Sequence, residues 1–140
     1  MNILFLCTGN SARSILGEVI FNDFFSNYGS AFSAGSHPVG KVNPVALETL
    51  ENHKHLTQKL TSKDVAVFAQ HGAELIDVVV SVCDHAAQDC LIWPAQNAPK
   101  RVHWSLPDPA SVEDEFEKKA AFEETYNALK TKISELVVNL

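Results

Sequence analysis

The chain has 140 residues, a length typical of one domain, and its 46% hydrophobic and 20% charged residues exclude a disordered protein. A net charge of −6 argues against a general nucleic-acid-binding protein, which would carry a basic excess. The sequence has no apolar stretch of the roughly 18 residues that a membrane span needs, and its N-terminus lacks the basic segment of a signal peptide. We therefore expect one domain over residues 1–140, in a cytoplasmic, monomeric protein that contacts neither nucleic acid nor membrane.

Strand and helix patterns alternate along the chain. The apolar run at residues 2–7 predicts a buried strand, and residues 15–28 place their apolar side chains on one face of a helix. Further along, the patterns predict a strand at 32–35, helices at 44–52 and 61–70, strands at 77–83 and 101–104, and a helix from 110 onward. Heptad-like spacing in the last helix also fits a coiled coil, but an amphipathic helix packed on a sheet is favoured. The alternation predicts an α/β fold with a four-stranded parallel sheet and helices on both faces.

Three chemically capable side chains follow strands of this predicted sheet. Cys7 ends the first strand, Cys83 ends the valine-rich strand at 77–83, and Asp108 comes shortly after the last strand. Because parallel α/β sheets bind ligands at the carboxyl ends of their strands, we expect these residues at one edge of the sheet. Three cysteines in a chain of this length favour reactive or buried thiols over a static disulfide framework.

The segment from Cys7 to Ser14 is a loop of small residues between a strand and a helix. Backbone N–H groups of such a loop, at a helix N-terminus, form a nest for a tetrahedral anion, and Arg13 adds a two-pronged donor. The same positive surroundings favour a thiolate, so Cys7 is the predicted nucleophile, with Ser14 able to donate to its sulfur. The predicted oxyanion-binding residues are Thr8, Gly9, Asn10, Ser11, Ala12, Arg13 and Ser14. The alternative is an ordinary turn with a buried cysteine.

The motif Cys-Thr-Gly-Asn-Ser-Ala-Arg-Ser at residues 7–14 resembles the phosphate-binding loop of the low-molecular-weight protein tyrosine phosphatase fold. Within that fold it is most similar to the thioredoxin-coupled arsenate reductases. The resemblance continues at residues 32–35, residues 42–44, Cys83, Cys90, Trp104 and residues 108–109. The loop alone does not separate a phosphatase from a reductase, whereas the two later cysteines favour the reductase, because a phosphatase has no use for them.

The resemblance implies arsenate reduction, for arsenate detoxification, through a relay of three cysteines. Cys7 attacks arsenic, Asp108 protonates the departing hydroxide, and Cys83 then attacks Cys7 so that arsenite leaves. Cys90 attacks Cys83, and thioredoxin reduces the resulting disulfide, with no bound cofactor. No residue of the sequence identifies the external reductant, so reduction by glutaredoxin stays open.

Local patterns around the two later cysteines leave alternatives open. The stretch 84–89 between Cys83 and Cys90 predicts a short helix. That helix would span ~10.5 Å, beyond the reach of a disulfide, and must therefore unwind if the two cysteines pair. A zinc site built from Cys83, His85, Cys90 and His103 is the alternative, although the spacing is unlike that of structural zinc sites.

Asp108 stands between Pro107 and Pro109, which stiffen the loop that carries it. The resemblance makes this aspartate the general acid for the leaving oxygen, whereas the local pattern alone also fits an ordinary Asp-Pro turn. Ala110 follows where phosphatases of this fold usually have an aromatic residue, and this favours a small inorganic anion as substrate.

Two other functions stay open. One is a low-molecular-weight protein tyrosine phosphatase that uses Cys7, Arg13 and Asp108, with Cys83 and Cys90 incidental. The other is a non-enzymatic sensor of arsenic or another oxyanion that uses the same three thiols. Activity with arsenate plus a thioredoxin system, compared with activity on an aryl phosphate, separates the three possibilities.

Reductases of the resembling family often hold a monovalent cation beside the loop. Asn10, Glu18 and Ser33 match three of its ligands, but Lys63 stands where the acidic ligand is expected. We expect the lysine ammonium to take the place of the cation and pair with Glu18, and we expect no other metal. The remaining histidines have no partner pattern and are interpreted as surface or helix-end residues: His37, His53, His55 and His71.

Overall fold

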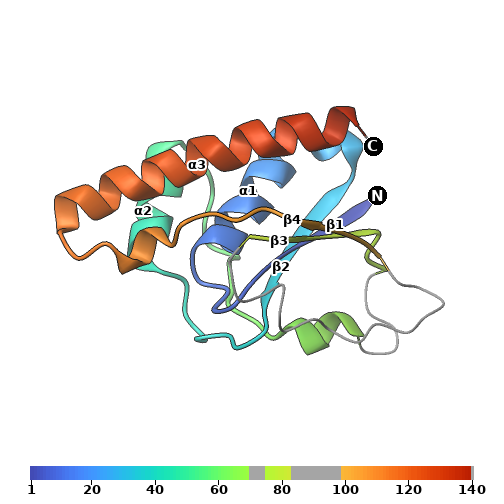
Figure 1. Cartoon of the computed structure of the whole chain (residues 1–140), viewed down its shortest axis with the longest axis horizontal. Helices are drawn as coiled ribbons and strands as arrows, with labels where there is room; N and C mark the ends of the chain where they lie inside the picture. The colour runs from blue at the N-terminus through green and yellow to red at the C-terminus, as the bar shows by residue number, and fades with distance from the viewer. Residues whose placement is uncertain (70–74, 83–98, 140) are drawn as a thin grey trace.

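The computed structural model of the protein describes residues 1–69, 75–82 and 99–139. The strands β1 (Asn2–Cys7), β2 (Ser30–Gly35), β3 (Val78–Ser81) and β4 (Lys100–His103) form one parallel sheet in the order β2-β1-β3-β4 (Figure 1). The helices are α1 (Arg13–Phe24), α2 (Pro44–Asn52) and α3 (Glu115–Val138), and short 3₁₀ turns are η1 (Ser26–Tyr28), η2 (Val65–Ala69) and η4 (Pro109–Ser111). The predicted four-stranded parallel α/β fold is therefore confirmed.

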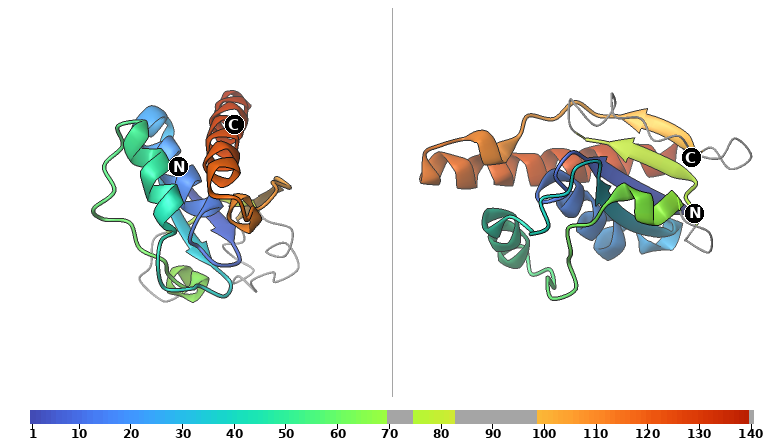
Figure 2. Two further views of the ribbon diagram at one scale, coloured as in Figure 1. Left: turned by 90° about the vertical axis from the view of Figure 1, so that its left-hand side faces the viewer. Right: turned by 90° about the horizontal axis from the view of Figure 1, so that it is seen from below.

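The three α-helices lie together on one side of the sheet (Figure 2). Helix α1 lies against β1 and β2, and α3 packs on α1. Gly17 permits this close approach, because a Cβ added there would lie 2.8 Å from the ring of Phe5 in β1. Among the described residues, η2 is the helical segment on the opposite face of the sheet. Its Phe68 ring lies 5.7 Å from the ring of Phe32 in β2. The sequence predicts helices on both faces of the sheet. In the described part of the chain, α-helices cover one face and a 3₁₀ turn lies on the other.

Two predicted helices in the first half of the chain differ from the structure at their ends. Helix α1 ends at Phe24 rather than near residue 28, because η1 follows it and Gly29 turns the chain at a φ of 147°. A Cβ at Gly29 would lie 1.8 Å from the Met1 carbonyl oxygen, so only glycine fits this turn. The predicted helix at 61–70 is wrong over residues 61–64, whose backbone lies in no helix and bonds elsewhere.

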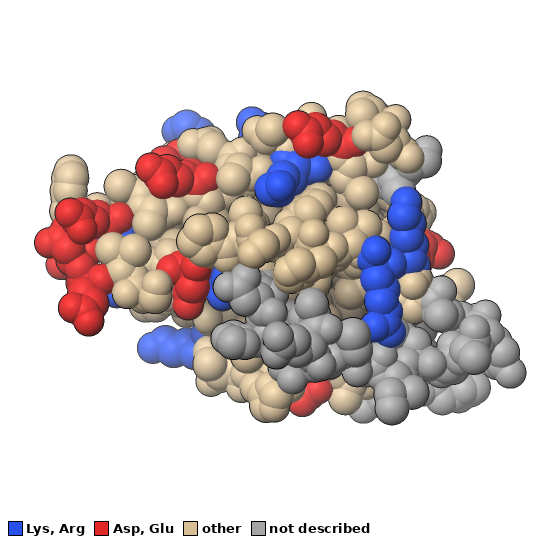
Figure 3. Space-filling view, viewed as in Figure 1, with Lys and Arg blue, Asp and Glu red and all other residues tan. Residues whose placement is uncertain are grey.

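The C-terminal helix begins later than residue 110. Asp114 caps α3 by accepting a hydrogen bond from the backbone N–H of Glu117 at 2.8 Å, and η4 precedes this cap. Exposed acidic side chains gather where α3 begins, at the left end of the molecule in Figure 3, and suit the helix N-terminus. The buried face of α3 is made by Phe122, Thr125, Tyr126, Leu129, Ile133 and Val137. None of the described helices is long and apolar enough to cross a membrane.

The two histidines after α2 form a cluster that the sequence analysis did not predict. His53 caps α2, stacks on Tyr126 with ring centroids 3.9 Å apart, and brings Nε2 within 2.7 Å of a Glu123 oxygen. His55 is only 6% exposed, with Nδ1 bonded to Asp23 and Nε2 2.6 Å from the Tyr126 hydroxyl. His55, expected at the surface or at a helix end, lies just after the end of α2 but is buried, so only a surface position is wrong. It joins the ends of α1 and α2 to α3.

We expect Tyr126→Phe to lower the free energy of unfolding by about 1–3 kcal/mol, because it leaves the buried Nε2 of His55 without its partner. Burial, with smaller contributions from the charges of Glu123 and Asp23, raises the pKa of Tyr126. Since the unfolded chain then releases this proton first, the wild type should lose stability as pH rises above ~10, and Tyr126→Phe should lose less. Chemical denaturation at pH 7 and above pH 10 measures both effects. Tyr28→Phe, at a half-exposed tyrosine, is the control and should leave both values unchanged.

Candidate functional site

Residues 8–14, which comprise the loop after β1 and the first two residues of α1, surround the buried sulfur of Cys7, and we call them the oxyanion loop. Cys7 Sγ lies 2.8 Å from Ser14 Oγ, and Ser14 Oγ accepts a hydrogen bond from Asn10 Nδ2, also at 2.8 Å. Because the amide nitrogen can only donate, the single proton of the serine hydroxyl is available to the sulfur. This arrangement suits a thiolate acceptor at Cys7.

Asn10 is the turning point of this loop. It is fully buried and takes a φ of 46°, a left-handed conformation that asparagine tolerates better than most residues. Its Oδ1 accepts from the backbone N–H of Lys63 at 2.8 Å, so the side chain links the 61–64 segment to Ser14. No described buried side-chain oxygen or nitrogen lacks a hydrogen-bond partner, so the network around Asn10 is complete.

The carbonyl groups of the oxyanion loop face the segment 36–43, which we call the rim segment. The backbone N–H groups of Ser36, His37, Val39 and Asn43 donate to the carbonyl oxygens of Cys7, Thr8, Gly9 and Ser11, at 3.2, 2.9, 3.0 and 2.8 Å respectively. In a trans peptide the N–H points opposite to the preceding carbonyl, and the described residues contain no cis peptide. The N–H groups that follow these four carbonyls therefore point away from the rim segment, as a nest for an anion requires.

Gly35, the last residue of β2, allows the chain to continue into the rim segment close to the oxyanion loop. A Cβ added at Gly35 would lie 2.6 Å from the Thr8 carbonyl oxygen and 3.0 Å from the backbone nitrogen of Asn10. Both contacts are with backbone atoms, which cannot move aside without deforming the loop. The glycine of the Phe32–Gly35 match thus has a physical reason, namely the close approach of two backbones.

Arg13 joins the oxyanion loop to the loop that carries Asp108. Its Nη1 donates to the carbonyl oxygen of buried Leu106 at 2.7 Å, and its Nη2 lies 3.9 Å from Asp108 Oδ2. Asp108 Oδ1 accepts from the backbone N–H of Ala110 at 3.0 Å, which fixes the carboxyl group at the start of η4. Half of the Asp108 side chain is exposed, whereas Arg13 is largely covered. Arg13 therefore links the Cys7 loop to Asp108 at the edge of the sheet expected for Cys7 and Asp108, whereas Cys83, the third residue expected there, lies outside the described residues.

The four residues of the predicted cation position lie together beside the loop. Ser33 Oγ donates to Glu18 Oε1 at 3.2 Å, and Lys63 is joined to Asn10 through its backbone. Burial raises the pKa of Glu18, and the Lys63 charge and the Ser33 hydrogen bonds oppose that rise. Burial lowers the pKa of Lys63, and Glu18 opposes that change. Lys63 Nζ donates to the Thr61 carbonyl at 3.0 Å and forms no ion pair with Glu18 within 4.0 Å, so the predicted pairing of the two side chains is not seen. The lysine charge acts on the partly buried carboxyl group without direct contact.

We expect the melting temperature of the wild type to be the same in potassium and sodium at matched ionic strength, because the Lys63 charge already favours the ionised form of Glu18. Lys63→Met should lower the free energy of unfolding by up to about 1 kcal/mol at pH 7, since the partly buried carboxyl group of Glu18 loses the favourable charge of the lysine. The Glu18 pKa then rises further, so the unfolded chain releases its proton first and stability falls as pH increases above ~4.5. Lys59→Met, at an exposed lysine, is the control. Stabilisation of the wild type by potassium alone would contradict this assignment.

Cys83, Cys90, His85, His71 and the predicted helix at 84–89 lie outside the described residues. The strand that precedes Cys83 in the sequence is the neighbour of β1, with Leu6 paired to Ser81 and the backbone N–H of Val82 donating to the Leu6 carbonyl at 2.9 Å. His103 lies in β4, where its Nδ1 is 2.6 Å from Ser81 Oγ. In the parts of the chain that the structure describes, no group of three metal-ligating side chains occurs.

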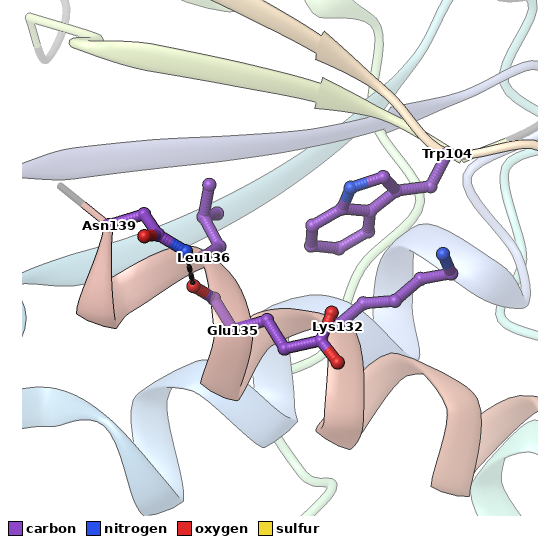
Figure 4. A pocket seen from close by; sticks show the side chains of 5 residues that line it. All are labelled: Trp104, Lys132, Glu135, Leu136 and Asn139. Atoms are coloured by element: carbon purple, nitrogen blue, oxygen red, sulfur yellow. Dashed lines mark hydrogen bonds between the residues drawn. The ribbon is translucent and has the colours of Figure 1, made fainter.

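Trp104 lies where β4 ends and borders a hollow on the α3 side of the sheet (Figure 4). The hollow has a volume of about 220 Å³ and is also lined by Lys132, Glu135, Leu136 and Asn139. The backbone N–H of Trp104 donates to the Ser81 carbonyl at 2.8 Å, and its ring lies 6.4 Å from that of Phe5. Trp104 therefore holds the start of the Asp108 loop on the sheet, and no cysteine lines the hollow.

The chain is similar over most of its length to proteins of one known family. Residues 2–140 match the model of the low molecular weight phosphotyrosine protein phosphatase family. The arsenate reductase of Halalkalibacterium halodurans is 34% identical over 119 residues, 85% of this chain and 81% of that protein. The arsenate reductase of Staphylococcus xylosus is 33% identical, over 83% of this chain and 85% of that protein.

Solved structures share the fold at lower identity. A low molecular weight protein tyrosine phosphatase from T. tengcongensis superposes with a TM-score of 0.78 at 22% identity, covering 100% of this chain and 99% of that chain. An arsenate reductase in the phosphate-binding state superposes with a TM-score of 0.76 at 21% identity, covering 99% and 97%. The fold is thus shared by phosphatases and reductases alike, and it does not choose between them.

Proposed function

We propose that this chain, which belongs to the low molecular weight phosphotyrosine protein phosphatase family, is an arsenate reductase. The observation that supports an anion site is the hydrogen-bonded Cys7 sulfur in an oxyanion loop whose N–H groups face away from the rim segment, and reduction is favoured over hydrolysis by the relatives and the later cysteines. Its sequence relatives named arsenate reductase support the same choice at about a third identity. Cys83 and Cys90 supply the two further thiols that reduction needs and hydrolysis does not.

The first step is attack by the Cys7 sulfur on arsenic. Arsenate has the shape and charge of phosphate, so the loop N–H groups and Arg13 bind it as they would phosphate. A sulfur–arsenic bond forms, an arsenic–oxygen bond breaks, and Asp108 gives its proton to the departing oxygen so that water leaves. The contact of Arg13 with both Leu106 and Asp108 supports this division of roles, because it keeps the acid beside the anion clamp.

The later steps move two electrons to arsenic. Cys83 attacks the Cys7 sulfur, the sulfur–arsenic bond breaks, and its electron pair stays on arsenic, which leaves as arsenite. Cys90 then attacks Cys83, and Cys7 is released as a thiolate. An external dithiol, which we propose to be thioredoxin, reduces the Cys83–Cys90 disulfide; glutaredoxin is the alternative. The need for an external dithiol reductant suits a protein of the reducing cytoplasm. We propose that the protein acts there as a monomer.

Phosphate-ester hydrolysis is the second candidate, because Cys7, Arg13 and Asp108 are also the groups that a phosphatase of this fold requires. Phosphorus(V) bound to sulfur is not reduced by a second thiol, so the later cysteines would then be idle. The alanine after Asp108-Pro109 provides no ring to stack on a tyrosyl substrate, and this supports a small inorganic anion instead.

A paired assay tests the proposal. The purified protein is given arsenate with thioredoxin, thioredoxin reductase and NADPH, and separately an aryl phosphate. We expect arsenite formation coupled to NADPH oxidation and only weak aryl phosphate hydrolysis. Efficient hydrolysis without arsenite formation would assign the phosphatase, and binding of arsenate without either product would assign a sensor.

A further inference from the structure

The Gly9 carbonyl, at the middle of the oxyanion loop, is held by two donors. The backbone N–H of Val39 donates to it at 3.0 Å, and the hydroxyl of Ser62 donates at 3.1 Å. The same Ser62 oxygen accepts from the backbone N–H of Gly40 at 3.1 Å. A serine hydroxyl has one proton, and here that proton goes to the loop while the oxygen holds the rim segment. Ser62 therefore ties the oxyanion loop and the rim segment together through one side-chain atom.

The backbone around Ser62 is anchored independently of its hydroxyl. The N–H of Lys63 donates to Asn10 Oδ1 at 2.8 Å, and the Lys63 carbonyl accepts from the N–H of Gly35 at 2.9 Å. Gly40 takes a φ of 84°, with no atom within 4 Å of an added Cβ, so the rim segment turns here without side-chain packing. Loss of the Ser62 hydroxyl should thus remove two hydrogen bonds without displacing residue 62.

The Gly9 carbonyl and the Asn10 N–H belong to one planar peptide group. Two donors on the carbonyl oxygen fix the rotation of that plane, and the N–H must then point to the opposite side. A carbonyl that accepts two hydrogen bonds also polarises its peptide group, which makes the N–H a better donor to an anion. The orientation and the donor strength of the Asn10 N–H therefore both depend on the Ser62 hydroxyl.

We propose that Ser62 is a positioning residue of the oxyanion site, which raises the affinity of the loop for a tetrahedral oxyanion by fixing the Gly9–Asn10 peptide. Ser62 acts through that peptide and does not itself touch the anion. The inference rests on the proposed function only in taking residues 8–14 as an anion site, and its test does not require arsenate reduction.

Ser62→Thr and Ser62→Val test the proposal, because threonine and valine have nearly the same shape and differ in the hydroxyl. The probe is inorganic phosphate, and the readout is its protection of Cys7 against iodoacetamide, followed by mass spectrometry of the Cys7 peptide. Protection as a function of phosphate concentration gives a dissociation constant, whatever the intrinsic reactivity of the thiol. Ser134→Val, at an exposed position of α3, is the matched control.

We expect Ser62→Val to weaken phosphate binding about five-fold, and Ser62→Thr to stay within about two-fold of the wild type. For arsenate reduction, KM should rise by the same factor in Ser62→Val while kcat changes little. Equal phosphate constants for the Thr and Val variants, even with a lowered melting temperature, would overturn the assignment. If the wild type fails to reduce arsenate but the two phosphate constants differ as expected, the proposed function fails and the role of Ser62 stands.

Discussion

Cys7→Ser should reduce the rate of arsenite formation by at least ~10⁴-fold while leaving the fold intact. The alcohol cannot replace a thiolate as nucleophile near neutral pH, and no sulfur remains for Cys83 to attack. The change is nearly isosteric at a buried position, and the Ser14 hydroxyl at 2.8 Å can hydrogen-bond an oxygen as well as a sulfur. The measurement is arsenite release with thioredoxin, thioredoxin reductase and NADPH in excess.

Binding of inorganic phosphate is the control for this variant. The carbonyls of the oxyanion loop are held by the rim segment, and Arg13 is held by Leu106, so neither depends on the sulfur. Calorimetry should therefore give Cys7→Ser a phosphate dissociation constant within a few-fold of that of the wild type. Sustained arsenite production by a folded Cys7→Ser protein would show that Cys7 is not the nucleophile.

Patterns that are local in the sequence predicted the parts of the fold made by local interactions. The valine run of β3 and the small-residue loop from Cys7 to Ser14 each report their structure within a few residues, and both were predicted correctly as a strand and as a strand-to-helix loop. The order of the strands is different, because a parallel α/β pattern does not fix which strands are neighbours. The structure supplies it through the pairing of Leu6 with Ser81, which makes β1 and β3 neighbours.

Contacts between residues far apart in the sequence could not be predicted from local patterns. Asp23 and Tyr126, the partners of His55, lie 32 and 71 residues away, so nothing beside the histidine signals its burial. The predicted helix at 61–70 is wrong over residues 61–64 for a similar reason, although η2 occupies residues 65–69. Ser62 bonds to the Gly9 carbonyl 53 residues earlier, and that contact outweighs a weak local helix preference. The prediction for Lys63 came from the resemblance, because a lysine in a polar loop carries no sign of a buried glutamate nearby.

Cys90→Ser should release about one arsenite per enzyme molecule and then stop. The first two attacks need only Cys7 and Cys83, so the variant completes one reduction and remains as a Cys7–Cys83 disulfide. Without a third thiol, nothing within the chain frees Cys7. Cys83→Ser should release none, because arsenic stays on Cys7 when no resolving thiol is present. The two variants therefore differ in the yield of a single turnover as well as in rate.

Peptide mass spectrometry after one turnover distinguishes these states, because each predicts a different cross-linked pair. The wild type without reductant should contain a Cys83–Cys90 disulfide and Cys90→Ser a Cys7–Cys83 disulfide, while Cys83→Ser should contain neither. The neighbouring positions of β1 and β3 favour the Cys7–Cys83 step, since adjacent strands are separated by only ~4.8 Å. Ser134→Ala, at an exposed position of α3, is a control that keeps all three thiols and should turn over repeatedly. If Cys90→Ser reduces arsenate through many turnovers with thioredoxin alone, the third cysteine is dispensable and the order of the relay is wrong.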